Sequence, residues 1–132
     1  MKKVLVFGIF DGLHPGHISF LRQAKKHGDF LVVAIGRASA CRQIKCKTPA
    51  HPLRQRLTAL RGEPLVNKAV PGDIKQGSYK VVLREKPDII CLGYDQSELD
   101  ADLKKWLSRH KLKIRIKNLK PYLPQKYHTS LL

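Results

Sequence analysis

Short apolar runs alternate along the chain with longer segments in which apolar residues recur every three or four positions. Short apolar runs are typical of strands, and the longer periodic segments are typical of helices. The apolar runs predict strands over residues 3–7, 30–36, 65–70 and 88–93, and an alternation of apolar and basic residues predicts a half-buried strand over 111–117. The periodic segments predict helices over residues 15–27, 52–60, 79–85 and 99–109.

Prolines help to place the ends of the predicted helices. Pro15 and Pro52 suit the first turn of a helix, where the missing N–H removes no hydrogen bond. The helix over 79–85 is expected to stop by Lys86, because the residue before Pro87 avoids helical backbone angles. Loops are expected over residues 38–47 and 72–77.

The alternation of strands and helices predicts an α/β fold, a Rossmann-like parallel sheet with helices on both faces. The 132 residues fit one domain, and their 42% hydrophobic content is enough for a core. Ligands of such sheets bind beyond the carboxyl ends of the strands, where the strand order changes direction. Gly8, Gly36 and Gly93 end three predicted strands, and we expect them to leave room for one ligand.

The most informative segment joins the first strand to the first helix and reads Gly8-Ile9-Phe10-Asp11-Gly12-Leu13-His14-Pro15-Gly16-His17. A helix start carries unpaired N–H groups and a partial charge of roughly +0.5, which suit phosphate oxygens. His14 and His17 lie one helical turn apart, so both imidazoles can face one ligand. Gly16 is expected to keep the approach open. The segment therefore predicts a site for the phosphates of a nucleotide.

Two other interpretations of the histidines stay open at this point. A histidine at a helix start is often a surface or capping residue. A pair of histidines can also bind a metal ion, but no Cys, Asp or Glu completes a ligand set at a useful spacing, so we expect no metal site. The glycine and lysine spacings of the dinucleotide fingerprint and the Walker loop are absent.

The segments Phe10-Asp11 and His14-Pro15-Gly16-His17 resemble the signature of the cytidylyltransferase-like nucleotidyltransferases. Two branches look most similar, the archaeal-type FAD synthetases, which are FMN adenylyltransferases, and the bacterial glycerol-3-phosphate cytidylyltransferases. The similarity runs over nearly the whole chain and continues through Ala24-Lys25-Lys26-His27-Gly28-Asp29 and Leu31-Val32-Val33. The segment Pro87-Asp88-Ile89-Ile90-Cys91-Leu92-Gly93-Tyr94-Asp95-Gln96 is more similar to the FAD synthetase branch.

The resemblance implies nucleotidyl transfer, in which a phosphate oxygen of an acceptor attacks the α-phosphorus of a nucleoside triphosphate and pyrophosphate leaves. His14, His17 and Lys47 are implied as catalytic residues. The implied acceptor-binding residues are Asp11, Lys45 and Arg56. The implied nucleotide-binding residues are Gly8, Ile9, Phe10, His14, Gly16, His17, Lys47, Gly93, Asp95, Thr129 and Ser130. Mg²⁺ is expected to arrive with the triphosphate, and the family implies a homodimer.

Some of these residues also fit a purely structural role. Lys45 and Lys47 also fit a solvated basic loop. Asp95 suits the hydroxyls of a ribose, and it also suits a cap for the following helix.

Three features depart from the family pattern. Ile9 stands where both branches usually have Thr, so a hydroxyl contact is lost while the backbone N–H stays available. His128 stands where a hydroxyl residue is usual, and the late cysteines of many archaeal FAD synthetases are absent. The chain also stops where the family's terminal helix begins, so one expectation is a single domain over residues 1–132 with a truncated terminal helix.

The substrates have two candidate sets. ATP with FMN is favoured by the segment over residues 87–96. CTP with glycerol 3-phosphate, or another small phosphorylated alcohol, is the alternative.

The charge of the chain suggests an alternative function that is not enzymatic. The net charge is +16, no acidic residue lies between Asp29 and Glu63, and a second basic stretch runs from Lys104 to Lys120. Such a field attracts polyanions, so a non-catalytic RNA-binding module on the same fold is the rival hypothesis. Nucleic acid is the less favoured partner, because the sequence shows neither a series of stacking aromatic residues nor a known recognition motif.

The cysteines and apolar runs indicate a cytoplasmic protein. Cys41, Cys46 and Cys91 lack the spacing of a metal site and fit reduced thiols, and Cys91 is expected in the core. No apolar run reaches the ~18–20 residues that span a bilayer. The apolar stretch after Met1 is short and runs into Asp11, which argues against a signal peptide.

Overall fold

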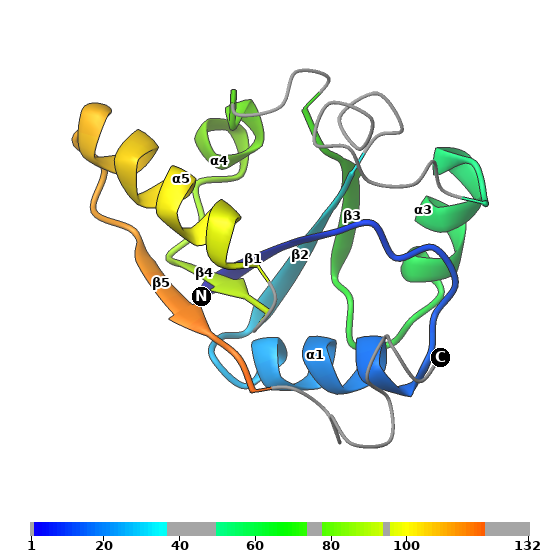
Figure 1. The fold of residues 1–132 in the computed structure, drawn as a ribbon. Coiled ribbons are helices and arrows are strands. Elements are labelled where there is room, and N and C mark those ends of the chain that lie inside the picture. Colours follow the sequence, from blue (N-terminus) through cyan, green and yellow to red (C-terminus); the bar gives the residue numbers. More distant parts are fainter. Residues whose placement is uncertain (1, 37–49, 74–77, 94–95, 121–132) are drawn as a thin grey trace.

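The computed structural model describes residues 2–36, 50–73, 78–93 and 96–120, and it contains one five-stranded parallel sheet (Figure 1). The strands are β1 (Lys3–Gly8), β2 (Phe30–Ile35), β3 (Lys68–Pro71), β4 (Ile89–Leu92) and β5 (Arg115–Asn118), in the order β3-β2-β1-β4-β5. The helices are α1 (Pro15–Lys25), α3 (Leu53–Arg61), α4 (Lys80–Glu85) and α5 (Ser97–Arg109). The predicted α/β fold is confirmed.

Each face of the sheet has its own core. Successive side chains of a strand point to opposite faces, and along β1 Val4 and Val6 join one cluster while Leu5 joins the other. The first cluster includes buried side chains of α1 and α3, and the second includes side chains of α4 and α5. Both faces are therefore covered, which explains why the central strands are apolar throughout.

The strand order places a switch point beside β1. The chain passes from β1 to β2 and β3 on one side, and then returns to β4 on the other side of β1. The carboxyl ends of β1 and β4 therefore border the place where open parallel sheets bind ligands. The segment with the two histidines follows β1 directly.

Two predicted strands begin later than the sequence pattern suggested. β3 starts at Lys68, after a turn in which the N–H of Val66 donates to the carbonyl of Glu63, and Asn67 then hydrogen-bonds to Leu31 of β2. β5 starts at Arg115, because Lys111 has a positive φ of 54° and the N–H of Leu112 donates back to Leu107. The predicted loop over 38–47 and part of that over 72–77 lie outside the described residues.

Cys91 is fully buried in β4, as the sequence predicted. Burial raises the pKa of its thiol to about 11, so the thiol stays protonated at neutral pH and acts as a core residue. Cys41 and Cys46 lie outside the described residues. Among the helices that the structure describes, none combines the length and the apolar character needed to cross a bilayer.

Candidate active site

The loop between β1 and α1 has unusual backbone geometry. Phe10 has a φ of 51°, although it is not a glycine, and its ring is buried. Gly12 has a φ of 90°, and its N–H donates to the carbonyl of Phe10 at 3.1 Å. A left-handed conformation at a bulky residue is strained and persists only where packing holds it, which is a frequent property of ligand sites.

His14 is the N-cap residue, immediately before α1. Its Nδ1 accepts hydrogen bonds from the N–H groups of Gly16 at 3.0 Å and His17 at 3.4 Å. His17 reciprocates, because its Nδ1 accepts from the N–H of His14 at 3.4 Å. The two histidines thus form a capping box, and their rings stack with centroids 3.7 Å apart and an interplanar angle of 22°.

These hydrogen bonds fix the tautomer of both neutral imidazoles. A ring nitrogen that accepts a hydrogen bond carries no proton, so the proton sits on Nε2 in both His14 and His17. Each neutral ring therefore has Nε2–H as its donor group. Two adjacent donors of this kind suit the oxygens of one phosphate.

The cap corrects one expectation about the start of α1. The sequence predicted N–H groups that phosphate would pair, but those of Gly16 and His17 donate to His14, and that of Ile18 donates to the His14 carbonyl at 3.1 Å. Pro15 has no N–H to offer. The first amides of α1 are therefore already hydrogen-bonded within the motif.

Glycines in this region allow side chains of the motif to pack closely against the backbone. A Cβ on Gly8 would lie 2.4 Å from the Phe10 ring, and a Cβ on Gly16 would lie 2.8 Å from Cε1 of His14. A Cβ on Gly36 would lie 2.6 Å from Cδ1 of Ile9. These contacts give Gly8, Gly16 and Gly36 a packing role, and the room that the sequence predicted for a ligand stays a prediction.

The buried Phe10 ring links the core to the histidines. Its edge contacts the ring of His17, with centroids 5.3 Å apart, and it also packs near Phe20 of α1. Ile9 and Phe10 contribute backbone groups as well. Within the described part of the chain, no hydrogen-bond acceptor faces the N–H of either residue, which leaves both groups able to meet a phosphate.

Arg56 ties three segments together from inside the protein. It is only 2% exposed. Its Nη1 donates to the carbonyls of Ile9 at 3.0 Å and Gly36 at 2.8 Å. Its Nε donates to the carbonyl of His51 at 3.0 Å. Burial lowers the pKa of the guanidinium, and the charge of Asp11 opposes this shift. These contacts indicate that Arg56 positions the ends of β1 and β2, and acceptor binding by its side chain stays a prediction.

Asp11 fastens the same loop to the segment before α3. Its carboxylate accepts hydrogen bonds from the N–H of Ala50 at 2.6 Å, from the N–H of His51 at 2.9 Å and from Nδ1 of His51 at 2.7 Å. These hydrogen bonds lower the pKa of Asp11 to about 2. The carboxylate therefore has a structural task, and its predicted contact with the acceptor remains untested.

Gln96 joins the two strands that border the switch point. Its Oε1 accepts from the N–H of Gly93 at 2.7 Å, and its Nε2 donates to the carbonyl of Phe7 at 3.1 Å. The sequence contains Gln96 in the segment over 87–96, but no pattern there indicates a bridge to β1. His51 was also missed, since a lone histidine in a basic segment carries no signal of pairing with Asp11.

Several predicted site residues lie outside the described residues, namely Lys45, Lys47, Asp95, Thr129 and Ser130. The structure brings together Gly8, Ile9, Phe10, Asp11, His14, Gly16, His17 and Arg56 around the ends of β1 and β2. Gly93 joins them through Gln96. Within the described ranges, no cluster of three or more His, Cys, Asp or Glu side chains could hold a metal ion.

A shallow groove borders this site along α1. His14, Pro15, Ile18 and Arg22 line one side, and Glu63 after α3 lines the other, in a volume of about 460 Å³. The groove gives His14 an approach from solvent.

The family model of the cytidylyltransferase-like proteins matches residues 5–131 of this chain. The chain belongs to the cytidylyltransferase-like family. An FAD synthase from Aciduliprofundum boonei is 38% identical over 122 residues, which cover 92% of this chain and 80% of that protein. An FAD synthase from Archaeoglobus profundus is 40% identical over 120 residues, which cover 91% of this chain and 76% of that protein.

Solved structures extend this family relationship to the fold. A lipopolysaccharide core biosynthesis protein from Thermoplasma volcanium is 36% identical and superposes with a TM-score of 0.85, covering 92% of this chain and 98% of that chain. A pantoate-β-alanine ligase from Francisella tularensis superposes with a TM-score of 0.65 at 17% identity, covering 98% of this chain and 66% of that chain. The latter similarity shows the fold alone. The family membership predicted from the His14–His17 motif is confirmed.

Proposed function

We propose that this nucleotidyltransferase transfers AMP from ATP to the phosphate of FMN and releases pyrophosphate. The observation that carries the proposal is the stacked His14–His17 pair, which directly follows β1 beside the switch point. In neutral imidazoles, hydrogen bonding at Nδ1 leaves Nε2–H as the group that would donate to a phosphate. The FAD synthase names of relatives that are 38–40% identical support the choice of ATP and FMN. The segment over residues 87–96 supports the same choice.

The reaction forms one bond and breaks one bond. An oxygen of the FMN phosphate attacks the α-phosphorus of ATP, and the bond from that phosphorus to the oxygen bridging the β-phosphate breaks. The electron pair leaves with pyrophosphate. A phosphate monoester is mostly a dianion near neutral pH, so the attack needs no strong base.

The chain contributes alignment and charge stabilisation. His14 and His17 donate to the α-phosphate oxygens, where negative charge builds up in the transition state. We assign Lys47, Thr129 and Ser130 to the leaving pyrophosphate and Lys45 to the acceptor, on the basis of the family motif. The N–H groups of Ile9 and Phe10 are suitable further donors to the nucleotide.

Mg²⁺ belongs to the substrate in this proposal. The triphosphate binds the ion through its own oxygens, as Mg²⁺ commonly does. The described residues fit this arrangement, because the carboxylate nearest the histidines in sequence, Asp11, already accepts three hydrogen bonds from Ala50 and His51. No step therefore requires a metal-binding cluster of the chain.

Initial rates of pyrophosphate release test the proposal. MgATP and MgCTP would each be crossed with FMN and with glycerol 3-phosphate, and the products would be identified by chromatography. We expect the ATP–FMN pair alone to give rapid release with FAD as product. Riboflavin is the matched control, since it lacks the attacking phosphate and should give no release.

The other outcomes separate the parts of the proposal. Release with CTP and glycerol 3-phosphate would retain the transferase chemistry and overturn the assigned substrates. No release with any pair, from protein shown to be folded, would overturn the proposal and favour a module that binds without turnover.

A further inference from the structure

Acidic side chains of this protein serve mainly internal contacts. Most of the ten acidic residues accept hydrogen bonds or pair with bases inside the fold. They are Asp11, Asp29, Glu63, Asp73, Glu85, Asp88, Asp100 and Asp102. Within the described ranges, many exposed basic side chains have no ion-pair partner, and the whole chain carries a net charge of +16.

The edge strand β5 carries a concentrated part of this charge. Lys113, Arg115 and Lys117 are exposed and alternate with the half-buried Ile114 and Ile116. Among the described residues, none of these three bases has a carboxylate partner. A strand rises about 3.3 Å per residue, so Arg115 and Lys117 of β5 follow one another at about 6.6 Å, which is similar to the spacing of phosphates in an extended nucleic acid strand.

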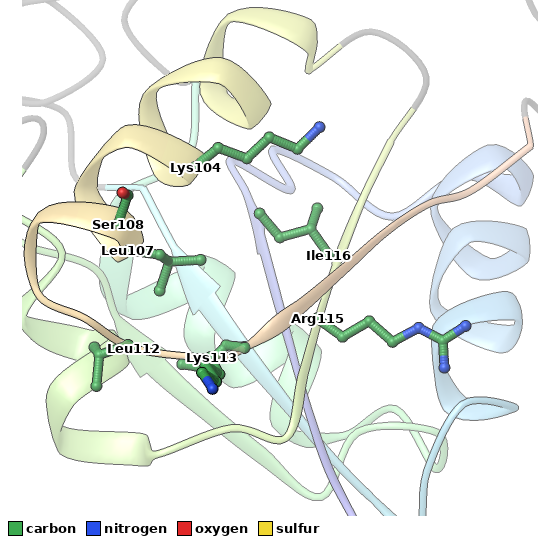
Figure 2. Close-up of a pocket in the computed structure, with 8 residues that line it drawn as sticks. Lys104, Leu107, Ser108, Leu112, Lys113, Arg115 and Ile116 are labelled. Atoms are coloured by element: carbon green, nitrogen blue, oxygen red, sulfur yellow. The ribbon is translucent and has the colours of Figure 1, made fainter.

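The surroundings of His27 show that basic side chains from different elements lie close together near β5. The pKa of His27 is lowered, first by burial and then by the charges of Lys117, Arg115 and Lys2. Lys2 precedes β1, and His27 follows α1. Figure 2 shows Arg115 extending from β5 toward α1. Lys2, Arg115 and Lys117 therefore lie around His27, and together with the exposed Lys113 just before β5 they are called the β5 basic surface.

A groove adjoins the β5 basic surface between α5 and β5 (Figure 2). It has a volume of about 530 Å³, and apolar side chains of both elements line it. Lys104, Lys113 and Arg115 add positive charge to its lining. Apolar side chains beside cations suit a ligand that has both planar apolar groups and phosphates.

We propose that the β5 basic surface binds a single-stranded nucleic acid. Its phosphates would contact Lys2, Lys113, Arg115 and Lys117, and its nucleobases would lie against the adjoining groove. This binding is separate from nucleotidyl transfer. Lys2 and His27 precede β1 and β2, and Arg115 is the first residue of β5, so this surface lies toward the amino ends of parallel strands. The His14–His17 pair lies beyond the carboxyl end of β1.

Fluorescence anisotropy with a labelled oligouridylate of about a dozen nucleotides tests the proposal, because single-strand sites span roughly 4–16 nucleotides. The titration would run from about 50 to 200 mM salt in the presence of MgATP and FMN, which occupy the proposed active site. We expect binding that weakens with salt. Each phosphate contact to a single strand contributes a slope of roughly −0.7 in log K against log salt.

The double variant Arg115→Gln with Lys117→Gln has a matched control in Arg54→Gln with Lys80→Gln, on exposed positions of α3 and α4. We expect the β5 variant to bind roughly tenfold more weakly at low salt and to lose about 1.4 units of salt slope. The control pair should change binding much less. Pyrophosphate release should be the same in both variants.

Three results would overturn the proposal. Absence of binding by wild-type protein would show that the bases only protect the edge strand from pairing, which is a common role of lysine there. Equal weakening in both variants would show a response to net charge rather than a site. Binding to anionic phospholipid vesicles without binding to the oligonucleotide would assign the surface to a membrane.

Nuclear magnetic resonance of His27 provides a second readout. Phosphates that neutralise Lys2, Arg115 and Lys117 would remove charges that now lower the His27 pKa. We expect the pKa to rise toward its ordinary value when the oligouridylate binds. An unchanged titration in the bound state would place the nucleic acid elsewhere and overturn the assigned surface.

Discussion

The imidazole of His14 has two nitrogens with different tasks. Nδ1 caps α1, and this hydrogen bond places the proton on Nε2, where it can serve a phosphate. The capping role and the catalytic role appeared as alternatives in the sequence. The structure shows the capping role, and the catalytic role stays a prediction in which the other ring nitrogen donates to a phosphate.

Gly16 controls the position of this ring, which leads to a prediction for Gly16→Ala. The added Cβ would lie 2.8 Å from Cε1 and 3.1 Å from Nδ1 of His14, so the ring must shift. We expect kcat to fall at least about tenfold, because small misplacements of a donor weaken transition-state contacts. The free energy of unfolding should change by less than about 1 kcal/mol, since alanine also favours the helix.

Gly62→Ala is the control for that measurement. Its added Cβ would meet backbone oxygens of Ala59 and Thr58 at 3.6 and 3.7 Å, which are ordinary contacts. Rates measured with saturating MgATP and FMN should match those of wild-type protein. If Gly16→Ala were as active as Gly62→Ala, the packing of Gly16 against His14 would not matter for catalysis.

The sequence predicted the histidines of the site but not their support. The glycine and histidine spacing at the strand–helix junction was enough to predict the family, because those residues are close together in the chain, and the phosphate site itself stays a prediction. The partners of Arg56 and Gln96 lie up to 89 positions away. Such contacts depend on how strands are ordered in the sheet, which local spacing does not reveal.

At the scale of elements, long side chains connect the strand ends that form the site. Arg56 reaches from α3 to the ends of β1 and β2, and Gln96 reaches from the start of α5 to β1. The sequence predicted all nine described helices and strands by periodicity, but it placed the starts of β3 and β5 too early. The backbone turn over residues 63–66 and the positive φ of Lys111 precede those starts, and periodicity does not detect either.

Glu85 secures the opposite end of the sheet. It ends α4, is buried, and accepts hydrogen bonds from Lys68 at 3.1 Å and Arg84 at 3.3 Å, with Lys3 at 3.8 Å. Burial alone would raise the pKa of Glu85, but the hydrogen bonds from Lys68 and Arg84 and the charges of Lys68 and Lys3 outweigh it and hold the pKa below its usual value. The ionised carboxylate therefore stabilises the folded state.

This lowered pKa predicts the effect of Glu85→Gln on stability at different pH values. The stabilisation is complete above the usual glutamate pKa of roughly 4.3, and it is lost as the pH falls through the lower pKa of the folded state. We expect Glu85→Gln to lower the free energy of unfolding by about 1–2 kcal/mol at pH 7 and by less at a pH of roughly 3. Urea denaturation at both pH values measures this difference.

Glu98→Gln, at an exposed position in the first turn of α5, is the control. It should have a smaller effect at neutral pH. A Glu85→Gln penalty that stays the same at both pH values would contradict an ionised, stabilising carboxylate.

At the scale of the whole molecule, the histidine pair and the β5 basic surface lie toward opposite ends of the parallel strands. The carboxyl ends of β1 and β2 gather the histidines and their support, and the amino ends gather the β5 basic surface. The alternating pattern of the sequence was sufficient to predict the fold. It could not predict how the bases are divided between the two ends, because that depends on register and strand order. The homodimer implied by the family stays a prediction.

The most direct test of the account is the rate of FAD formation from MgATP and FMN by His14→Asn. Asparagine is a good capping residue and keeps an acceptor for the helix N–H groups, but it lacks the Nε2–H donor. We predict that the free energy of unfolding stays within about 1 kcal/mol of the wild-type value, while turnover falls at least about a hundredfold, the usual loss for one transition-state donor. Near-normal turnover by His14→Asn would contradict the assigned role of the histidine pair.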